Sequence, residues 1–394
     1  MNDLFNYKRR ESTVAHAGST AIGGGNPIRV QSMTTTNTND TEACVAQAER
    51  IIKAGGELVR LTTQGTREAE NLKNINASLR TKGYDTPLVA DVHFNPNVAD
   101  VAALYAEKVR INPGNYVDPA RTFKKLEYTD EEYAAELKKI EARFVPFLNI
   151  CREHHTAVRI GVNHGSLSDR IMSRYGDTPE GIVESCMEFL RICKREAFDD
   201  VVISVKASNT MVMVRSVRLL VSRMEAEDMH YPLHLGVTEA GEGEDGRIKS
   251  AVGMGALMAD GLTDGLWLMN NGGIALRDIA DTAFAILQAA RLRTSKTEYI
   301  SCPGCGRTLY DLRSTIARIK ESTAHLRGLK IGIMGCIVNG PGEMADADYG
   351  YVGAGVGKVS LYRRKECVEK NIPEAEAVER LLALIDRDRK ARQE

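Results

Sequence analysis

The chain has 394 residues, 43% of them hydrophobic, which is ordinary globular composition and enough for two or three domains. Lys and Arg number 52 and Asp and Glu 53, so the chain lacks the net basic charge on which nucleic-acid affinity depends. No apolar run approaches the roughly 18 residues of a membrane span. The N-terminal residues lack the apolar core of a secretory signal. We therefore expect a cytoplasmic protein that binds neither nucleic acid nor a membrane.

Residues 1–25 are polar and Gly-rich, and we interpret them as a lead-in rather than a domain. Short β-branched runs then alternate with amphipathic segments of helical period. The eight predicted strands are 28–33, 57–62, 87–92, 108–112, 158–162, 201–205, 232–237 and 265–269, and the predicted helices include 41–54, 129–142, 179–195 and 274–293. This alternation predicts an α/β fold of the (β/α)8 TIM-barrel type rather than a doubly wound sheet. No G-x-G-x-x-G follows the first strand, which also argues against dinucleotide binding.

Polar residues lie at the carboxyl ends of the predicted strands, where TIM-barrel enzymes place their chemistry. They are Gln31, Ser32, Arg60, Thr62, Asp91, His93, Arg110, Asn112, Arg159, Asn163, Lys206, Ser208, His234 and Glu239. Three arginines and a lysine at one mouth predict a bound anion, and guanidinium groups suit phosphate oxygens. The alternative is that several of these cations pair with Asp or Glu on neighbouring strands.

Weaker signals accompany these strand ends. The Gly-rich loops 112–115 and 163–166 could present backbone amides to a phosphate. His93, His164 and His234 are more often structural than catalytic in such positions.

The predicted barrel domain covers residues 1–293, and residues 294–394 form a second domain. Predicted strands 330–334, 349–352 and 358–362 and predicted helices 308–327 and 373–387 indicate a small α+β domain. We interpret the Gly-rich segment 353–358 as a turn between two strands, because it lacks the spacing of a phosphate-binding loop.

Three cysteines of the second domain lie in Gly-rich turns. Cys302 and Cys305 form a Cys-x-x-Cys pair, Cys336 follows an apolar run, and Glu343 ends a Gly-Pro-Gly turn. Three thiolates and one carboxylate suit an iron–sulfur cluster with an exchangeable ligand better than a closed zinc site. A zinc knuckle remains the alternative. The remaining cysteines (Cys44, Cys151, Cys186, Cys193 and Cys367) are interpreted as core residues or have no motif context.

Eight segments together resemble the 4-hydroxy-3-methylbut-2-enyl diphosphate synthase family of the non-mevalonate isoprenoid pathway. They are Val30–Thr34, Val89–Phe94, Arg110–Asn115, Arg159–Asn163, Ser204–Ser208, Leu235–Gly241, Cys302–Cys305 and Gly335–Glu343. The resemblance implies that two electrons from ferredoxin or flavodoxin open 2-C-methyl-D-erythritol 2,4-cyclodiphosphate and remove a hydroxyl as water. It also implies a head-to-tail homodimer.

The resemblance assigns roles to individual residues. A [4Fe-4S] cluster would be held by Cys302, Cys305, Cys336 and Glu343, with Glu343 leaving one iron open to the substrate. The substrate-binding residues would be Arg60, Arg110, Arg159 and Lys206 on the diphosphate, with Asp91, His93 and Asn163 in the same site. Glu239 would donate a proton. The rival to this reading is a zinc-stabilised barrel protein that binds a phosphorylated ligand without redox activity.

The chain departs from the family at the eighth strand. The family usually has Asp-Thr-Ile-Arg-Val-Ser there, whereas Asp264 is followed here by Gly-Leu-Trp-Leu-Met. Segments 287–291 and 297–300 resemble a branch of the family that carries a large extra domain between barrel and cluster domain. Our hypothesis is that the chain is a three-domain-type sequence without its insert, joined near residues 255–270. Its anion site would then lack two donors.

Overall fold

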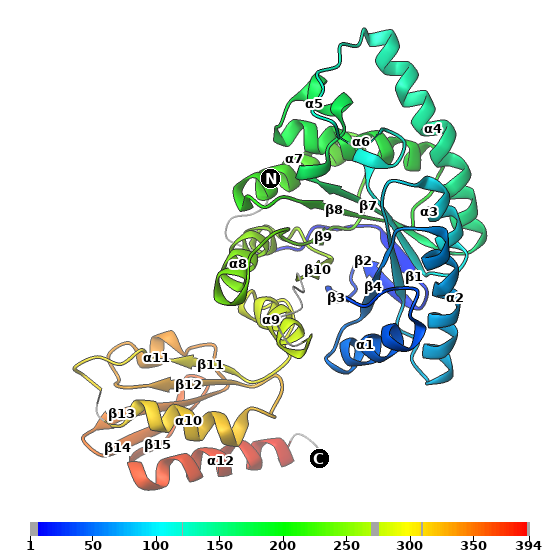
Figure 1. Cartoon of the computed structure of the whole chain (residues 1–394). Helices are drawn as coiled ribbons and strands as arrows, with labels where there is room; N and C mark the ends of the chain where they lie inside the picture. The colour runs from blue at the N-terminus through cyan, green and yellow to red at the C-terminus, as the bar shows by residue number, and fades with distance from the viewer. Residues whose placement is uncertain (1–6, 120, 269–275, 309, 392–394) are drawn as a thin grey trace. The chain divides into compact units, whose positions relative to one another are not determined.

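The computed structural model describes residues 7–119, 121–268, 276–308 and 310–391. They belong to two compact units, residues 1–286 and 287–394, which are considered separately (Figure 1). The division falls within helix α9 (Leu276–Ala289), a few residues before the domain boundary expected at 293 and 294, which stays a prediction. No helix among the described residues is long and apolar enough to cross a lipid bilayer.

The first unit is built on eight parallel strands. They are β3 (Arg29–Met33), β4 (Leu58–Thr63), β5 (Leu88–Val92), β6 (Lys108–Ile111), β7 (Ala157–Asn163), β8 (Val201–Lys206), β9 (His234–Leu235) and β10 (Gly265–Trp267). Strands β3 to β8 pair in chain order, and β10 pairs with both β3 and β9. An isolated bridge between Ile203 and Leu233 joins β8 to the chain entering β9, which closes the ring. The predicted TIM barrel is confirmed.

Helices surround this ring of strands (Figure 1). They are α1 (Thr41–Lys53), α2 (Thr66–Thr81), α3 (Pro96–Ala103), α4 (Asp130–Glu153), α5 (Asp169–Tyr175), α6 (Pro179–Arg195), α7 (Thr210–Ala226), α8 (Gly243–Ala259) and α9, with 3-10 turns η1 (Pro113–Asn115) and η2 (His164–Ser166). Side-chain caps such as Asp40, Thr129 and Asn209 accept hydrogen bonds from the first-turn amides and fix where helices begin. Helix α4 continues well past the predicted end at residue 142, and residues 274 and 275 of the predicted last helix lie outside the described ranges.

The N-terminal segment, interpreted from its composition as a lead-in rather than a domain, contains regular structure that its composition did not predict. It forms an antiparallel hairpin of β1 (Val14–Ala17) and β2 (Thr20–Gly23). Its buried residues Ala15, Ala17 and Ile22 share a core cluster with Leu58, Val89, Ala157 and Val202. Because these four residues lie at or near the starts of their strands, the hairpin covers the amino-terminal end of the barrel. The opposite end, where the strands finish, is left for the site.

The second unit is a five-stranded sheet with helices. Its strands are β11 (Glu298–Ser301), β12 (Lys330–Met334), β13 (Tyr349–Gly355), β14 (Lys358–Arg363) and β15 (Glu366–Pro373), in that spatial order, and its helices are α10 (Leu312–Thr323), α11 (Gly340–Glu343) and α12 (Glu374–Ala391). Strands β11 to β13 are parallel and the others antiparallel. Figure 1 shows α10 and α12 along one face of the sheet, where Ile319, Tyr351 and Leu381 share a buried core. The predicted α+β domain is confirmed, as is the turn between β13 and β14.

Candidate active site

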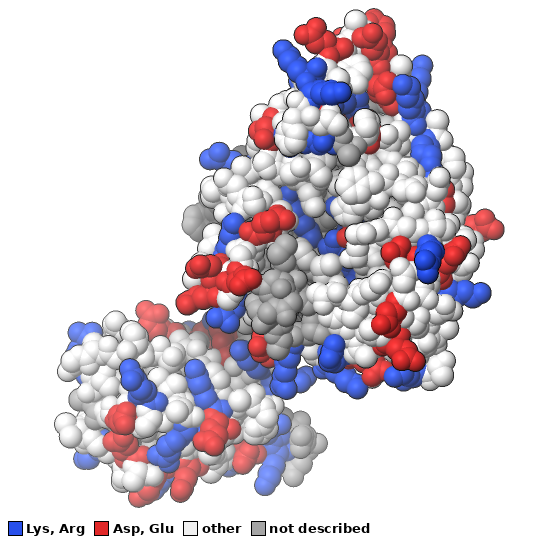
Figure 2. Space-filling model, viewed as in Figure 1, with Lys and Arg blue, Asp and Glu red and all other residues white. Residues whose placement is uncertain are grey.

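The cationic residues predicted at the barrel mouth are brought together inside the barrel. Strand alternation directs Arg60, Arg110, Arg159 and Lys206 inward from β4, β6, β7 and β8, with exposed fractions of 8%, 2%, 1% and 5%. They border a cavity of about 290 Å³, whose lining is Met33, Arg60, Arg110, Arg159, Asn163, Ser204, Lys206, Thr238 and Trp267. Figure 2 shows Lys and Arg atoms deep in the hollow of the barrel unit. Buried cations around a cavity form a candidate anion site.

Within the described residues, Asp91 is the one carboxylate in ion-pair contact with these cations. It accepts hydrogen bonds from Arg60 and, at 3.1 Å, from Arg110 Nη1, and it lies 4.0 Å from Arg159 Nη2. Arg110 also donates through Nη2 to the carbonyl of Gly161 at 2.8 Å. One carboxylate therefore balances only part of the charge of four buried cations. The alternative, pairing with an acidic residue of a neighbouring strand, therefore holds for Arg60 and Arg110, and both pair with the same residue, Asp91.

The pKa values of these groups reflect the excess of buried positive charge. Burial by itself would raise the pKa of Asp91, but Arg60 and Arg110 hold it well below its usual value. Burial lowers the pKa of Arg110 to about 10, although Asp91 acts in the opposite direction. For both Arg159 and Lys206, burial and then neighbouring cations lower the pKa well below the usual value. A bound anion would relieve this repulsion.

Several guanidinium donors in the cavity wall have no partner among the described residues. They are Nε of Arg60, Nε of Arg110, and Nε and Nη1 of Arg159. A buried donor without an acceptor normally costs about 1–3 kcal/mol, and more when it is charged. Gly161 makes room for this crowding, because a Cβ at that position would come within 2.3 Å of Arg110 Nε. The donors are therefore held in place for an acceptor that a bound anion would supply.

The other predicted substrate-binding residues have different surroundings. Asn163 lines the cavity, whereas Asp91 and His93 do not appear in its lining. His93 contacts Arg110 through Nε2, which also lies 3.6 Å from Asp91 Oδ2. Burial lowers the pKa of His93 in spite of the nearby Asp91 carboxylate, so the ring stays neutral near pH 7. We interpret His93 as support for Arg110 and Asp91. His234 is buried and His164 contacts Asp177.

The two Gly-rich loops brace each other. The Gly114 amide already donates to Asn112 Oδ1 at 3.2 Å, and Asn112 Nδ2 donates to Ser166 Oγ at 2.8 Å. A Cβ on Gly114 would approach the Ser166 carbonyl oxygen to 1.8 Å, so only glycine fits between the loops. The Gly114 amide is thus not available to a phosphate, contrary to the expectation from sequence.

Glu239, the predicted proton donor, lies just beyond β9. Its side chain is exposed and accepts a hydrogen bond from Thr238, which lines the cavity, but Glu239 is not itself part of the lining. Its backbone has a φ of 46°, in the left-handed region that non-glycine residues rarely adopt. Such positions cluster at functional sites, where the surrounding structure fixes them.

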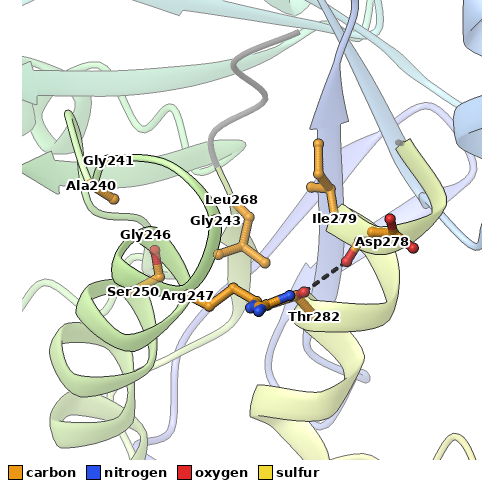
Figure 3. A pocket seen from close by; sticks show the side chains of 10 residues that line it. All are labelled: Ala240, Gly241, Gly243, Gly246, Arg247, Ser250, Leu268, Asp278, Ile279 and Thr282. Carbon is orange, nitrogen blue, oxygen red and sulfur yellow. Dashed lines mark hydrogen bonds between the residues drawn. The ribbon is translucent and has the colours of Figure 1, made fainter. Parts of the chain in front are cut away.

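A second, smaller cavity of about 100 Å³ lies between the start of α8 and α9 (Figure 3). Arg247 of α8 extends across it towards Thr282 of α9, and Thr282 donates to the Asp278 carbonyl at 2.7 Å. Leu268 forms part of its wall, directly after β10. Arg247 and Asp278 were not predicted as cavity residues, because neither stands at the end of a strand.

Trp267 is the inward-facing residue of β10 where the resemblance leads one to expect an arginine. Its ring lies beneath two of the cavity cations, with Lys206 Nζ 3.6 Å and Arg60 Cζ 5.3 Å from a ring centroid. From the sequence, the missing arginine and serine of the eighth strand predicted only a loss of hydrogen-bond donors at the anion site. The lost serine would fall at Met269, which lies outside the described residues.

In the second unit, the predicted cluster ligands lie on neighbouring turns. Cys302 follows β11 and Cys336 follows β12, two adjacent parallel strands in which Ser301 pairs with Ile333. Thr308 links the two turns: its Oγ1 accepts from the Cys305 amide at 3.1 Å, and it packs so closely on Gly335 that a Cβ there would approach Thr308 Oγ1 to 2.8 Å. Glu343 is the last residue of α11.

These residues fit an iron–sulfur cluster in donor type, and the turns that carry the cysteines are adjacent. Thiolates are the usual ligands of such clusters, and the three predicted cysteines are at least partly exposed and form no disulfide. Among the described residues, however, no three Cys, His, Asp or Glu side chains are grouped closely enough to hold a metal ion. The turns are adjacent, but the side chains are not oriented as a completed ligand set.

Comparisons with known proteins place this geometry in a family. The GcpE TIM-barrel domain matches residues 12–268, and the GcpE protein C-terminal domain matches residues 298–387. A protein of Phocaeicola vulgatus named 4-hydroxy-3-methylbut-2-en-1-yl diphosphate synthase (flavodoxin) is 49% identical over 604 aligned positions, covering 97% of this chain and 98% of the relative. A protein of Prochlorococcus marinus subsp. pastoris with the same name but the qualifier ferredoxin is 46% identical over 392 positions, covering 97% and 94%.

The two alignments differ greatly in length. The first extends over 604 positions although this chain has 394 residues, so a long stretch of that relative has no counterpart here. The second relative needs no such gap. Both kinds of relative share the barrel and the C-terminal domain, and the family models together match most of the chain. The chain therefore belongs to the GcpE family.

Proposed function

We propose that this chain is a 4-hydroxy-3-methylbut-2-en-1-yl diphosphate synthase. Its substrate would be 2-C-methyl-D-erythritol 2,4-cyclodiphosphate, which two electrons open and dehydroxylate, with the hydroxyl leaving as water. The relatives carry this enzyme name across almost the full length of the chain. The single observation that carries the proposal is the buried cavity bordered by four cations, of which Asp91 pairs with three, because such an excess of buried positive charge favours an anionic ligand.

The residues of the barrel would bind and orient the diphosphate. Arg159 and Lys206 offer donors and charge that no described carboxylate fully neutralises, and Asp91 holds Arg60 and Arg110 in fixed positions. Asn163 would contribute a neutral hydrogen-bonding group to the same cavity. Glu239, held next to the cavity wall by Thr238, would supply a proton to the hydroxyl that leaves as water.

The second unit would supply electrons. Cys302, Cys305 and Cys336 would hold a [4Fe-4S] cluster together with Glu343. When bound, the cluster would deliver electrons singly and act as a Lewis acid towards a substrate oxygen. Glu343 ends the short helix α11, outside the turns that carry the cysteines, so this oxygen ligand would be able to exchange while the thiolates stay in place.

Further parts of the proposal follow from the resemblance. The electron donor would be flavodoxin or ferredoxin, the two qualifiers in the relatives' names. The enzyme would act in the cytoplasm as a head-to-tail homodimer. We also retain the hypothesis that the chain is a three-domain-type sequence without its insert, and the long gap in the 604-position alignment supports it. Aligning strand eight of similar chains without the insert tests this hypothesis: Arg-Val-Ser in most of them would refute it.

The experiment that tests the function is anaerobic incubation of the reconstituted full-length protein with the cyclic diphosphate and a chemical reductant, followed by phosphorus NMR. We expect the signals of the ring to be replaced by those of a linear diphosphate. Glu239→Gln should bind the substrate with similar affinity and form product much more slowly. The rival function, a zinc-stabilised phosphate-binding barrel, predicts bound zinc, ligand binding and no product.

A further inference from the structure

Trp267 is the one tryptophan of the chain, and it lies in the wall of the anion cavity. It ends β10, pairs in register with Gln31 of β3, and is 4% exposed. The neighbouring strand β9 is followed by Gly236, where a Cβ would come within 3.2 Å of both Lys206 Cε and Trp267 Cε3. The absence of a side chain at residue 236 therefore allows the indole ring and the lysine stem to lie together.

The face of the indole ring holds a cation that forms no ion pair with any carboxylate in the described part of the chain. Lys206 Nζ lies 3.6 Å from a ring centroid, and no described carboxylate forms an ion pair with it. Arg60 Cζ lies 5.3 Å from a ring centroid, while its guanidinium is also bound to Asp91. An ammonium group over the face of tryptophan is attracted by the negative potential of the ring, most strongly when water is excluded. The ring thus fixes the position of Lys206 at the cavity.

The edge of the indole ring carries an unused donor. Trp267 Nε1 is buried and has no hydrogen-bond partner among the described residues. Buried Trp N–H groups usually donate to an acceptor, because a buried donor without a hydrogen bond is energetically unfavourable. In a cavity that is also lined by the cations Arg60, Arg110, Arg159 and Lys206, the acceptor most compatible with the surroundings is an oxygen of an anion.

We propose that Trp267 is a positioning residue of the anion site, holding the Lys206 ammonium with its ring and donating its N–H to an oxygen of the bound diphosphate. The proposal deepens the function proposed above and rests on it for the identity of the substrate. The binding of an anion at Trp267 is nevertheless testable without turnover. The neutral N–H of Trp267 would add a hydrogen bond to the anion without adding a fifth positive charge to four cations that already repel one another.

The single tryptophan makes the test direct. Inorganic pyrophosphate is titrated into the full-length protein while tryptophan emission is recorded, with sodium sulfate at matched ionic strength as the control. We expect a saturable change in emission with pyrophosphate whose midpoint agrees with the dissociation constant from calorimetry. Pyrophosphate binding by calorimetry without any change in emission would overturn the proposal, since it would place the anion elsewhere.

Variants separate the ring from the N–H. Trp267→Phe keeps an aromatic face and loses the donor, so pyrophosphate affinity should fall about tenfold. Trp267→Leu loses both, and affinity should fall about 100-fold or more. The matched control is Tyr116→Phe, which removes another buried group without a described partner from the same unit but outside the cavity, and should leave affinity unchanged. Equal affinity for all three variants and the wild type would overturn the proposal.

Two further readouts distinguish this proposal from a structural role and from the proposed function. The melting temperatures of ligand-free Trp267→Phe and Trp267→Leu show whether a loss of pyrophosphate affinity reflects unfolding. If only Trp267→Leu loses affinity, and its melting temperature falls as well, a positioning role is contradicted. If pyrophosphate changes the emission but the cyclic diphosphate is never converted, the function fails while the anion site at Trp267 stands.

Discussion

Arg110 donates from Nη1 to Oδ1 of Asp91 at 3.1 Å, and through this bond two neighbouring barrel strands fix the geometry of the cation cluster. Arg110 is 2% and Asp91 4% exposed, so neither charge is compensated by water. The other oxygen of Asp91 is held by Arg60. Asp91 is thus the structural centre of a site that otherwise consists of mutually repelling cations.

Asp91→Asn should destabilise the protein by about 3 kcal/mol at pH 7, because it leaves buried arginines uncompensated. The pKa of Asp91 is held well below its usual value in the fold, so its contribution is fully present above the unfolded-state pKa of about 4. It is lost as pH falls through the lower, folded-state pKa. Urea unfolding should therefore show a large difference between wild type and variant at pH 7 that narrows in acid. Asp85→Asn, an exposed change, is the control. Equal stability at pH 7 would contradict this role.

Arg159→Met should have the opposite effect on stability. It replaces a fully buried cation, with Arg60 and Arg110 nearby, by an apolar chain of similar length, so the free energy of unfolding should stay the same or rise by about 1–2 kcal/mol. Pyrophosphate affinity should fall about 100-fold, the loss expected for one or two charge-assisted hydrogen bonds. Calorimetry measures both quantities. The exposed Arg152→Met is the matched control, and undiminished binding by Arg159→Met would show that Arg159 does not contact the anion.

Binding of pyrophosphate should be coupled to uptake of a proton by Lys206. In the free protein, burial and neighbouring cations hold the pKa of Lys206 well below its usual value, and a bound anion raises it. Protons are therefore taken up between the two pKa values, and affinity falls as pH rises through that window. Calorimetry in buffers of different ionisation enthalpy measures the uptake. Lys206→Met should abolish this component; an unchanged proton uptake in that variant would assign it to another group.

Replacing one cluster ligand should remove iron from the second unit. Cys336→Ala should lose the cluster, whereas Glu343→Ala should keep a labile one, because three thiolates remain. Cys367→Ala is the matched control: this cysteine lies on β15, where its Sγ contacts the Glu369 carbonyl, and it belongs to no ligand set. Iron and sulfide analysis after anaerobic reconstitution provides the measurement. A full cluster in Cys336→Ala would exclude the proposed ligands.

The barrel could be predicted from sequence because its determinants are local. Most of the strands are short apolar runs, and the alternation within them directs Arg60, Arg110 and Arg159 inward once the ring closes. The hairpin of residues 14–23 was missed because its burial depends on contacts with Leu58, Val89 and Val202, which are distant in sequence. The local sequence pattern that suggests a strand there is the alternation of the apolar residues Ala15 and Ala17 with the polar His16.

The site was predicted in part for the same reason. The predicted strand ends identified the four cations as candidates. That three of them share one carboxylate, Asp91, becomes apparent only when strands β4 to β8 are placed side by side. The Gly-rich loops looked like phosphate binders, since sequence does not show that Gly114 packs against Ser166. From the sequence, Trp267 was noted only as the absence of the family's arginine. Its stacking on Lys206 depends on the lack of a side chain at Gly236, which directly follows the neighbouring strand β9, and sequence alone does not show this contact.

Turnover of the cyclic diphosphate by anaerobically reconstituted wild-type protein, with iron, sulfide and zinc determined in the same sample, decides whether the chain is this synthase. We expect about four irons per chain and formation of the linear diphosphate with consumption of two electrons per product. Slow turnover would still agree with an anion site in which tryptophan replaces an arginine. Four irons with no product at all, or zinc in place of iron, would contradict the proposed function.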